Sequence, residues 1–440
     1  MMNKKIIAIV LLATLLSSTA GVFGSVQKVE AADTGYSTQM IGELGEASTV
    51  LIYSQIDANI KIYIPDANWV PTTQYITVTV STGAMGSGSF VSADGYIATA
   101  GHVVFSFTHT DITQDLYVKP LLVDTSFSVL LQALENDGYV FTADEQATLR
   151  AYVDQYGELK DSIRSVYAVL GEVKPTLTDI QAKGWVARVV SVSPYNERDL
   201  ALLKIEGLSN CPILPVGDSD KVLTGDDVFM FGFPGVVTFH AELGPETTLA
   251  PSMTRGIISA SRVTNFQTPC FQTDAAITHG NSGGAGLNNK GEIVGICSRG
   301  SISDTGQEVA GFDFVIKSNV LKTMMNEAGV NNVKGPVDDH FMKGLQYYYG
   351  KHYTAAKTEF DTAAGLFAYH WRAKDLITEC NSAIANGNDV PVSSGISIGN
   401  WLWIAIAAVV IVVVVLIAAM LVMKARKGKA NLPPPPPPGM

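Results

Sequence analysis

The chain carries a short apolar strand pattern that reads Gly95-Tyr96-Ile97-Ala98-Thr99-Ala100-Gly101-His102-Val103-Val104. This run predicts a buried strand that enters a turn, with His102 at its end. A second run, Arg198-Asp199-Leu200-Ala201-Leu202-Leu203-Lys204-Ile205, begins with an acid. A carboxylate at the start of a buried strand is costly unless it is hydrogen-bonded, and an imidazole N–H satisfies it. The alternatives are a turn or N-cap role for Asp199 and a purely structural histidine at 102.

Short β-rich runs continue along the chain, separated by Gly, Pro, Asn and Asp. They are Thr49–Tyr53, Tyr75–Val80, Ser89–Val91, Tyr96–Ala100, Val186–Val192, Leu200–Ile205, Gly256–Ser261, Phe271–Asp274, Ile293–Cys297 and Gly311–Val315. Many short strands with frequent turns are typical of an all-β barrel or sandwich. Helical spacing interrupts them between about residues 120 and 171, where Thr142 and Glu145 form a capping-box pair. We therefore expect a mainly β domain with an α-helical insertion on its surface.

Composition limits the classes of function. The length of 440 residues predicts about three units. Lys and Arg number 30 against 41 Asp and Glu, so the net charge is −11 and nucleic acid is a poor partner. The 47% hydrophobic and 16% charged residues indicate that part of the chain lies in lipid. Four cysteines without CxxC spacing exclude a disulfide-dense scaffold and weaken zinc and thioredoxin interpretations, so we expect no metal site.

Both ends of the chain suggest a membrane context. Lys4 and Lys5 precede an apolar run from Ile6 to Leu16 that is too short to span a bilayer, which predicts a signal peptide at 1–31. An uncleaved anchor is the alternative. Residues 401–423 contain no charge and are long enough for a transmembrane helix. The basic residues that follow predict a cytoplasmic tail at 424–440, ending in prolines 433–438, and an extracytoplasmic position for everything before the span.

A second helical pattern covers residues 338–387. Its small, aromatic and apolar positions match one tetratricopeptide-like helical hairpin, with His340 and Ala368 where Trp and Pro are usual. A single repeat cannot bury its own face, so this hairpin packs on the β domain, on a partner protein or on a second copy in a homo-oligomer. Residues 388–400 then form a linker.

The segment Gly280-Asn281-Ser282-Gly283-Gly284 is the strongest candidate for chemistry. A serine between glycines can sit on a tight turn as an exposed nucleophile, with the amides of Gly280 and Ser282 as an oxyanion hole. The alternative is a glycine-rich hairpin loop. A nucleophilic serine needs a base, for which His102 and the loop residue His279 compete. His102, Asp199 and Ser282 follow the chain order of one known triad lineage.

These segments, together with Gln272–Ile277 and Gly225–Pro234, resemble the HtrA/DegP-type branch of the trypsin-like serine proteases. The resemblance covers about residues 45–328 and implies two six-stranded β-barrels with an active site between them and no cofactor. It implies His102 as base, Asp199 as its orienter, Ser282 as nucleophile, and Gly280, Asn281 and Ser282 as the oxyanion loop. The long spacing from His102 to Asp199 places the insertion at about 106–184. Unlike the family, the sequence shows no PDZ domain after the protease domain, and the helical hairpin occupies that place.

The resemblance also implies where substrate binds. Ala276 takes the position at the base of the pocket for the P1 side chain, the residue before the cleaved bond. Ile277 narrows that pocket, and Cys297-Ser298-Arg299-Gly300 forms its opposite wall and pairs with an extended substrate. Because a methyl group offers nothing to a cation, we expect cleavage after small or medium aliphatic residues. Cys270 and Cys297 either pair as a disulfide or stay as buried thiols.

We therefore expect a membrane-anchored, extracytoplasmic serine endopeptidase that acts on unfolded or extended protein chains in protein quality control. Two alternatives remain at this point. One is a catalytically silent relative that binds peptides. The other is a scaffold in which the helical hairpin and the proline-rich tail are the functional parts.

Overall fold

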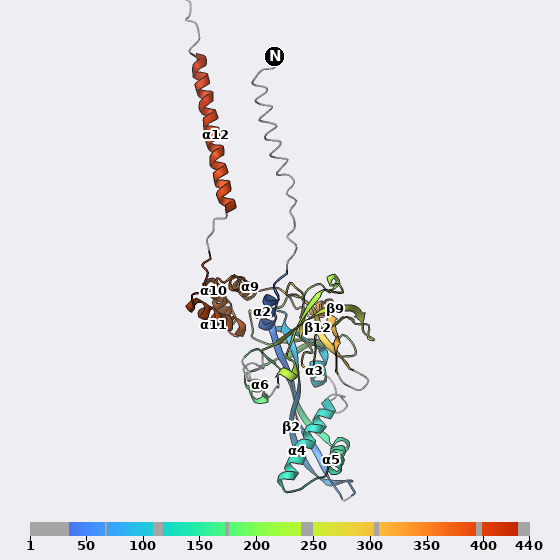
Figure 1. Cartoon of the computed structure of the whole chain (residues 1–440). Helices are drawn as coiled ribbons and strands as arrows, with labels where there is room; N and C mark the ends of the chain where they lie inside the picture. Colours follow the sequence, from blue (N-terminus) through green and yellow to red (C-terminus); the bar gives the residue numbers. More distant parts are fainter. Residues whose placement is uncertain are drawn as a thin grey trace, which may run out of the picture. The chain divides into compact units, whose positions relative to one another are not determined.

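The computed structural model describes residues 35–66, 68–108, 118–171, 176–238, 250–302, 308–392 and 398–429 (Figure 1). They belong to two compact units, residues 1–388 and residues 389–440. The predicted signal peptide lies outside the described residues, as does the proline run at 433–438.

Seven strands of the first unit form one antiparallel sheet in the order β5-β4-β1-β2-β3-β7-β6. The strands are β1 (Thr49–Pro65), β2 (Pro71–Phe90), β3 (Tyr96–Thr99), β4 (Glu158–Val169), β5 (Trp185–Val186), β6 (Arg188–Ser193) and β7 (Leu200–Lys204). The expectation of a six-stranded barrel for this half is therefore wrong. The reason is β4, which comes from the insertion and pairs with β1 from Leu51 to Lys61.

Six further strands form a closed barrel in the order β10-β13-β12-β11-β8-β9, which confirms the prediction for the second half. The strands are β8 (Asp227–Gly232), β9 (Ser252–Val263), β10 (Pro269–Thr273), β11 (Ala285–Leu287), β12 (Ile293–Ile302) and β13 (Glu308–Lys317). The short helices α7 (Gly235–Thr238) and η1 (Ser219–Lys221) lie in its connections, and α8 (Ser318–Glu327) follows β13.

One buried apolar cluster joins the sheet to the barrel. Ala98 of β3 and Leu200 of β7 pack there with Phe229, Phe231 and Ile296 of the barrel. Every residue of β7 is buried, and all but Lys204 are apolar, so this strand needs partners on both of its faces. The cluster therefore holds the ends of β3 and β7, where His102 and Asp199 lie, against the barrel.

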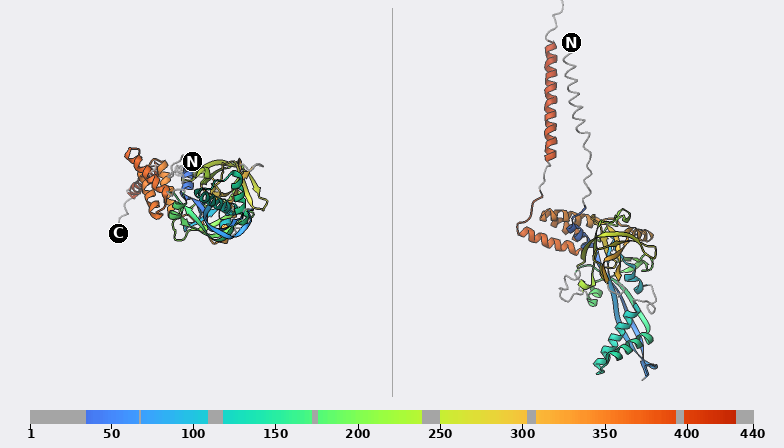
Figure 2. Two further views of the ribbon diagram at one scale, coloured as in Figure 1. Left: turned by 90° about the horizontal axis from the view of Figure 1, so that it is seen from below. Right: turned by 45° about the vertical axis from the view of Figure 1, so that its right-hand side comes forward.

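The insertion forms an arm that extends away from the barrel (Figures 1 and 2). The outer parts of β1, β2 and β4 carry the helices α4 (Val118–Asn136) and α5 (Ala143–Tyr156), and they bury their own apolar cluster, which includes Ile60 and Tyr152. The capping box at Thr142 and Glu145 is confirmed. The prediction of helix up to residue 171 is wrong, because residues 158–169 alternate in burial and pair with β1 as a strand. The short helix α6 (Leu177–Lys183) ends the insertion.

Three helices, rather than the two of a hairpin, occupy the region predicted at 338–387. They are α9 (Pro336–Tyr349), α10 (Tyr353–Leu366) and α11 (Trp371–Ala385), which we call the helical module. Gly344 faces Phe360 so closely that a Cβ would lie 2.4 Å from the ring, which explains the small residue there. The module packs on the β domain, where the rings of Phe367 and Phe90 meet at 6.4 Å. This agrees with one of the three expected packing modes, while the tetratricopeptide likeness stays a prediction.

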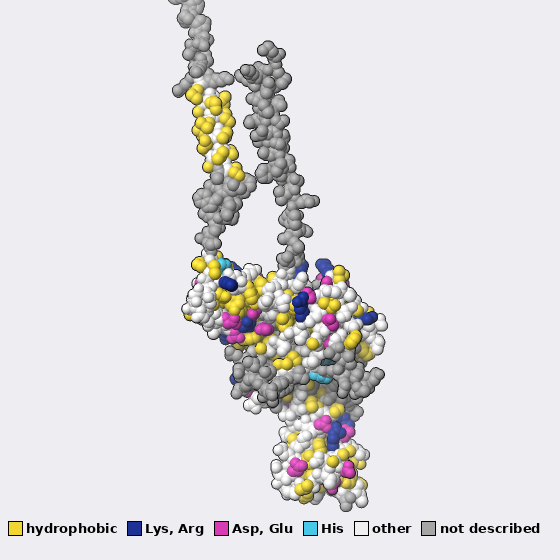
Figure 3. Space-filling model, viewed as in Figure 1, with side chains coloured by type: hydrophobic (Ala, Val, Ile, Leu, Met, Phe, Trp, Pro, Cys, Tyr) yellow, Lys and Arg dark blue, Asp and Glu magenta, His cyan; other side chains and the backbone are white. Residues whose placement is uncertain are grey.

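The second unit contains α12 (Ile398–Lys429), whose apolar side chains are exposed from Val409 to Met423 wherever they are described (Figure 3). A helix with both the length and the apolar character of a membrane span is absent from the part of the chain that the structure describes. The transmembrane helix predicted at 401–423 is therefore not supported. The predicted linker at 388–400 lies partly outside the described residues.

Candidate active site

His102 lies at the start of α3 (Gly101–Thr108), directly after β3. β3 pairs with β2 on one side and with β7 on the other, so the histidine starts from a rigid strand, as predicted. The chain turns at Gly101, where a Cβ would lie 1.9 Å from the carbonyl oxygen of Ser193, so only glycine fits. The His102 side chain is 27% exposed, which leaves the imidazole accessible from one side.

Asp199 is fully buried and binds His102 with its carboxylate. Both carboxylate oxygens lie 3.0 Å from His102 Nδ1, and the backbone N–H of His102 donates to Oδ1 at 2.8 Å. The hydroxyl of Ser298 donates to Oδ2. These donors satisfy the hydrogen-bonding capacity of the buried acid. Asp199 also adopts a φ of 50°, an uncommon conformation for a residue other than glycine.

This pairing determines which imidazole nitrogen is free. A carboxylate accepts only from a protonated nitrogen, so His102 carries its hydrogen on Nδ1 when it is neutral. Nε2 then has a lone pair and lies on the side of the ring away from Asp199. The ring of Tyr195 meets the imidazole edge-on at 6.0 Å between centroids.

The loop of Ser282 is held between β2 and β12. Ser87 donates its backbone N–H to the Ser282 carbonyl at 2.7 Å and its hydroxyl to the Gly280 carbonyl at 2.7 Å. On the other side, the amide of Gly283 donates to the Cys297 carbonyl at 2.8 Å. A Cβ placed on Gly86 would lie 2.9 Å from both Val103 Cγ1 and the Ser282 carbonyl, so the loop runs beside the first turn of α3.

Glycine is required at two positions of this loop. Gly280 has a φ of 97° and Gly283 a φ of 88°, values that favour glycine. A Cβ on Gly283 would also lie 2.1 Å from the Ser87 carbonyl oxygen. The amide of Asn281 donates to the Thr278 carbonyl, and the Asn281 carbonyl accepts from Gly284. Within the described structure, the amides of Gly280 and Ser282 donate to no other group, so both are available to a ligand.

His279, the competing base, lies in the same loop and is exposed. Its carbonyl accepts from the Gly235 amide at 2.8 Å. Asp199 binds His102 and not His279, so the geometry favours His102 as the base.

Comparison with known proteins agrees with this geometry. Residues 86–296 match the family model described as "Trypsin-like peptidase domain". The chain contains a trypsin-like peptidase domain. The expected resemblance to HtrA/DegP-type serine proteases is confirmed for this domain.

Curated relatives match this domain over part of their length. One is the "Serine protease Do-like HtrA" of Lactobacillus helveticus, 36% identical over 152 residues, or 33% of this chain and 34% of the relative. Another is the "Periplasmic serine endoprotease DegP" of Salmonella typhimurium, 32% identical over 160 residues, or 35% of this chain and 30% of the relative. The match therefore spans about a third of the length of these relatives. The solved structure "HtrA-type protease AlgW with decapeptide" covers 66% of this chain and 67% of its own at 20% identity, with a TM-score of 0.39.

The residues predicted to line the substrate pocket differ in their burial and in their hydrogen bonds. Ala276 is exposed and accepts a hydrogen bond from the Thr254 hydroxyl through its carbonyl, while Ile277 is buried against Cys297. The Ser298 hydroxyl donates to Asp199 Oδ2. Arg299 lies on β12 opposite Phe314, and Gly300 is exposed.

The cysteines of the domain are buried thiols. All four cysteines of the chain are described and none forms a disulfide, which decides the alternative left open for Cys270 and Cys297. Burial raises the pKa of the Cys297 thiol, and the carboxylates of Asp313 and Asp199 raise it further. Cys297 therefore stays protonated and carries no nucleophilic role.

Two residues of this region were missed by sequence reasoning. The Ser298 hydroxyl was assigned to the substrate pocket, and no local pattern reveals that it reaches an acid 99 residues away. Asp313, an acid that is 1% exposed, lies within the apolar stretch Phe312–Ile316 of β13. The reasoning applied to Asp199, that an acid on a buried strand is costly unless it is hydrogen-bonded, would have singled it out.

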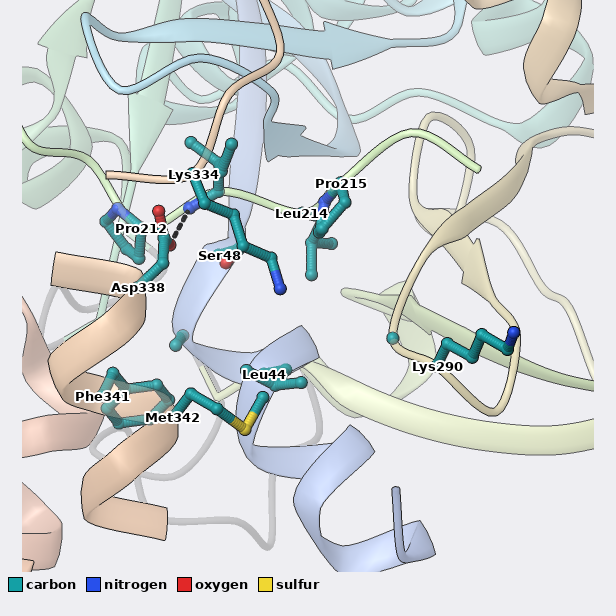
Figure 4. A pocket seen from close by; sticks show the side chains of 13 residues that line it. Leu44, Ser48, Pro212, Leu214, Pro215, Lys290, Lys334, Asp338, Phe341 and Met342 are labelled. Carbon is teal, nitrogen blue, oxygen red and sulfur yellow. Dashed lines mark hydrogen bonds between the residues drawn. The ribbon is translucent and has the colours of Figure 1, made fainter. Parts of the chain in front are cut away.

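A small cavity lies away from these residues, between α2 (Thr38–Ser48), α9 and the loop at 212–215 (Figure 4). Asp338 lines it and accepts hydrogen bonds from the amides of Ile213 and Gly335 at 2.9 and 2.8 Å. Burial raises the pKa of Asp338 to about 6. The acid therefore joins the helical module to the β domain. No group of three or more His, Cys, Asp or Glu side chains suited to a metal ion occurs among the described residues.

Proposed function

We propose that the chain is a serine endopeptidase with Ser282 as nucleophile, His102 as general base and Asp199 as the residue that orients His102. The observation that carries this proposal is the buried Asp199 carboxylate on His102 Nδ1, which leaves Nε2 as the proton acceptor. The neighbouring loop of Ser282, held by Ser87 and Cys297, supports it.

In the proposed reaction, Ser282 Oγ attacks the carbonyl carbon of a peptide bond while His102 Nε2 takes the hydroxyl proton. The carbonyl oxygen becomes an anion, and the unused amides of Gly280 and Ser282 donate to it. Asn281 shapes this loop. His102 then gives its proton to the leaving amine, the C–N bond breaks, and an acyl-enzyme remains. A water molecule then attacks the acyl-enzyme while His102 takes its proton, and the new carboxylate is released. Asp199 stabilises the imidazolium in both halves.

The substrates of this activity are unfolded or extended protein chains. The backbone of Ser298–Gly300 pairs with the substrate as an added strand, which gives affinity without a sequence requirement. Ala276 and Ile277 lie beside the P1 side chain. The setting in protein quality control rests on the resemblance found in the sequence, and the relative named as a periplasmic serine endoprotease supports the extracytoplasmic location.

The proposed location is extracytoplasmic, with a single-pass anchor at 401–423 and a cytoplasmic tail. This part rests on the sequence alone, through the charge-free run and the basic residues after it. The helical module then offers a surface to a partner protein or to a second copy. Protease added to protoplasts should digest the peptidase domain and spare a tag after Met440. Release of the full chain from membranes by alkaline carbonate would contradict the anchor.

Labelling of the full chain by a fluorophosphonate probe, followed by hydrolysis of denatured casein, tests the activity. Ser282→Ala should abolish labelling and leave only residual hydrolysis, while circular dichroism stays that of the wild type. His102→Ala should lower labelling and hydrolysis nearly as far as Ser282→Ala does. His279→Ala, the matched control in the loop of Ser282, should lower them much less. Equal hydrolysis by wild type and Ser282→Ala would instead indicate a silent peptide-binding relative.

A further inference from the structure

Ser87 of β2 is fully buried, and its polar atoms meet three separate parts of the peptidase domain. Its backbone N–H donates to the Ser282 carbonyl and its hydroxyl to the Gly280 carbonyl, at 2.7 Å each. The hydroxyl oxygen also accepts from the backbone N–H of Phe233, directly after β8, at 2.9 Å. The sheet, the barrel and the loop of Ser282 therefore meet at one buried side chain.

The bond from Phe233 determines where the Ser87 hydroxyl hydrogen points. A serine hydroxyl has a single hydrogen to donate, and a backbone N–H can only donate. The Phe233 amide therefore occupies a lone pair of the hydroxyl oxygen, and the hydrogen goes to the Gly280 carbonyl. Because a buried carbonyl without a donor is costly, this bond fixes the orientation of the peptide group between Gly280 and Asn281.

Gly280 depends on partners outside the loop for its orientation. Its φ of 97° favours glycine, and a glycine can change its backbone conformation at small cost. The peptide groups on its two sides are both held from outside: the His279 carbonyl accepts from the Gly235 amide at 2.8 Å, and the Gly280 carbonyl accepts from Ser87. In a trans peptide the N–H points opposite to the C=O. The Gly280 N–H therefore points away from Gly235 and stays available to a ligand.

Ser87 also restrains the second proposed donor, the amide of Ser282. Its two bonds reach the carbonyls of Gly280 and Ser282, and the Ser282 amide lies between these carbonyls along the backbone. The Asn281 carbonyl, which shares a peptide group with that amide, accepts from Gly284 at 2.9 Å, so the Ser282 N–H points the other way. Donors that are already oriented stabilise an oxyanion most, because they need no reorganisation during the reaction.

We propose that Ser87 is a positioning residue of this site, whose hydroxyl holds the amides of Gly280 and Ser282 in the orientation that binds the oxyanion. This inference deepens the proposed function and rests on it. Because Ser87 is fully buried, it acts through the loop and not by touching substrate. Loss of its hydroxyl therefore leaves substrate binding in place and raises the barrier only where charge develops on the carbonyl oxygen.

Ser87→Ala in the full chain removes the hydroxyl and keeps the backbone bond to Ser282. On a tetrapeptide p-nitroanilide with leucine at P1, kcat should fall roughly 10- to 100-fold while KM stays nearly constant. Ser89→Ala is the matched control, because Ser89 is a buried serine of the same strand whose hydroxyl has no partner within the described structure. Its kcat should stay at the wild-type value. Equal kcat values for the two variants would overturn the inference.

A transition-state analogue separates positioning from a general loss of structure. When a peptide aldehyde binds, Ser282 Oγ bonds to the aldehyde carbon, the C=O π bond opens, and the hydroxyl proton passes to His102 Nε2. The aldehyde oxygen then occupies the oxyanion position, so the inhibition constant should rise in Ser87→Ala by the factor by which kcat/KM falls. The uncleaved peptide should bind equally to Ser282→Ala with and without Ser87→Ala. Equal weakening of both ligands would indicate a merely structural role and refute the inference.

Circular dichroism and urea denaturation show whether Ser87→Ala folds. Should it not, Ser87→Cys takes its place, because a thiol is a weaker donor than a hydroxyl. A lowered kcat with unchanged KM in folded Ser87→Cys supports the inference, and a wild-type kcat overturns it. Ser282-dependent hydrolysis that loss of the Ser87 hydroxyl leaves unchanged refutes the inference alone. A wild type without Ser282-dependent hydrolysis refutes the proposed function, and the inference falls with it.

Discussion

The peptidase site and the helical module both bury charges, but they use them differently. In the site, Asp199 binds His102, whose Nε2 remains free on an accessible side. In the module, the guanidinium of Arg372 in α11 is taken up by hydrogen bonds within the chain. It donates twice to Glu43 and once to Glu379, at 3.2 Å. A buried charge alone is therefore no sign of an active site. A buried charge indicates an active site when its partner keeps a donor or acceptor that remains open.

The surplus of acids around Arg372 sharpens this contrast. Glu43 and Glu46 come from α2, while Glu379 comes from α11 itself, and one guanidinium serves all three. Burial, and after it the charge of Glu43, raises the pKa of Glu46 to about 7 in spite of Arg372. The cluster therefore ties α2 to the module most firmly when Glu46 carries a proton.

The largest expected effect belongs to the site. Asp199→Asn should lower kcat on a peptide substrate roughly 10⁴-fold, because an amide permits the wrong tautomer of His102. The free energy of unfolding should change far less than the barrier to catalysis. Single-turnover kinetics and urea denaturation measure the two quantities. A fall in kcat of less than tenfold would mean that Asp199 has only a structural role, like the buried charges of the module.

The next effect belongs to the module. Arg372→Ala should lower the free energy of unfolding by about 3 kcal/mol, because it leaves the Glu43 carboxylate buried without its cation. kcat on a short peptide should stay at the wild-type value. Arg188→Ala is the control, since the Arg188–Glu206 pair is exposed and worth at most ~1 kcal/mol. Loss of kcat in folded Arg372→Ala would mean that the module controls the site.

The smallest effect is a pH dependence. Glu46 has a raised pKa in the folded chain, so its contribution to stability is present below its ordinary pKa and is lost as the pH rises to about 7. Glu46→Gln removes that loss and should raise the free energy of unfolding at pH 8 by about 1 kcal/mol, with no gain at pH 4. Urea denaturation at both pH values measures it. Equal changes at the two pH values would exclude titration of Glu46.

Local sequence was sufficient for the parts whose signals are local. The strand ending at His102, the acid opening β7 and the Gly-Asn-Ser-Gly-Gly loop each carry their pattern within about ten residues. The capping box of α5 does so as well. Alternation and capping depend on neighbours along the chain, which explains why the strands of the second barrel and the start of α5 were predicted.

Only the tertiary structure decided features that depend on partners far along the chain. Residues 158–169 became β4 because β1 offered a free edge, although helices precede them. The Ser298 hydroxyl donates to Asp199 because the barrel packs against the sheet that carries Asp199. Asp313 came to lie 3.5 Å from the position of a Cβ on Gly300 because β12 and β13 pair. A strand pattern tells which residues are buried, whereas register and closure tell what they are buried against. For this protein, the residues proposed as a triad could be singled out from local sequence, but their surroundings could not.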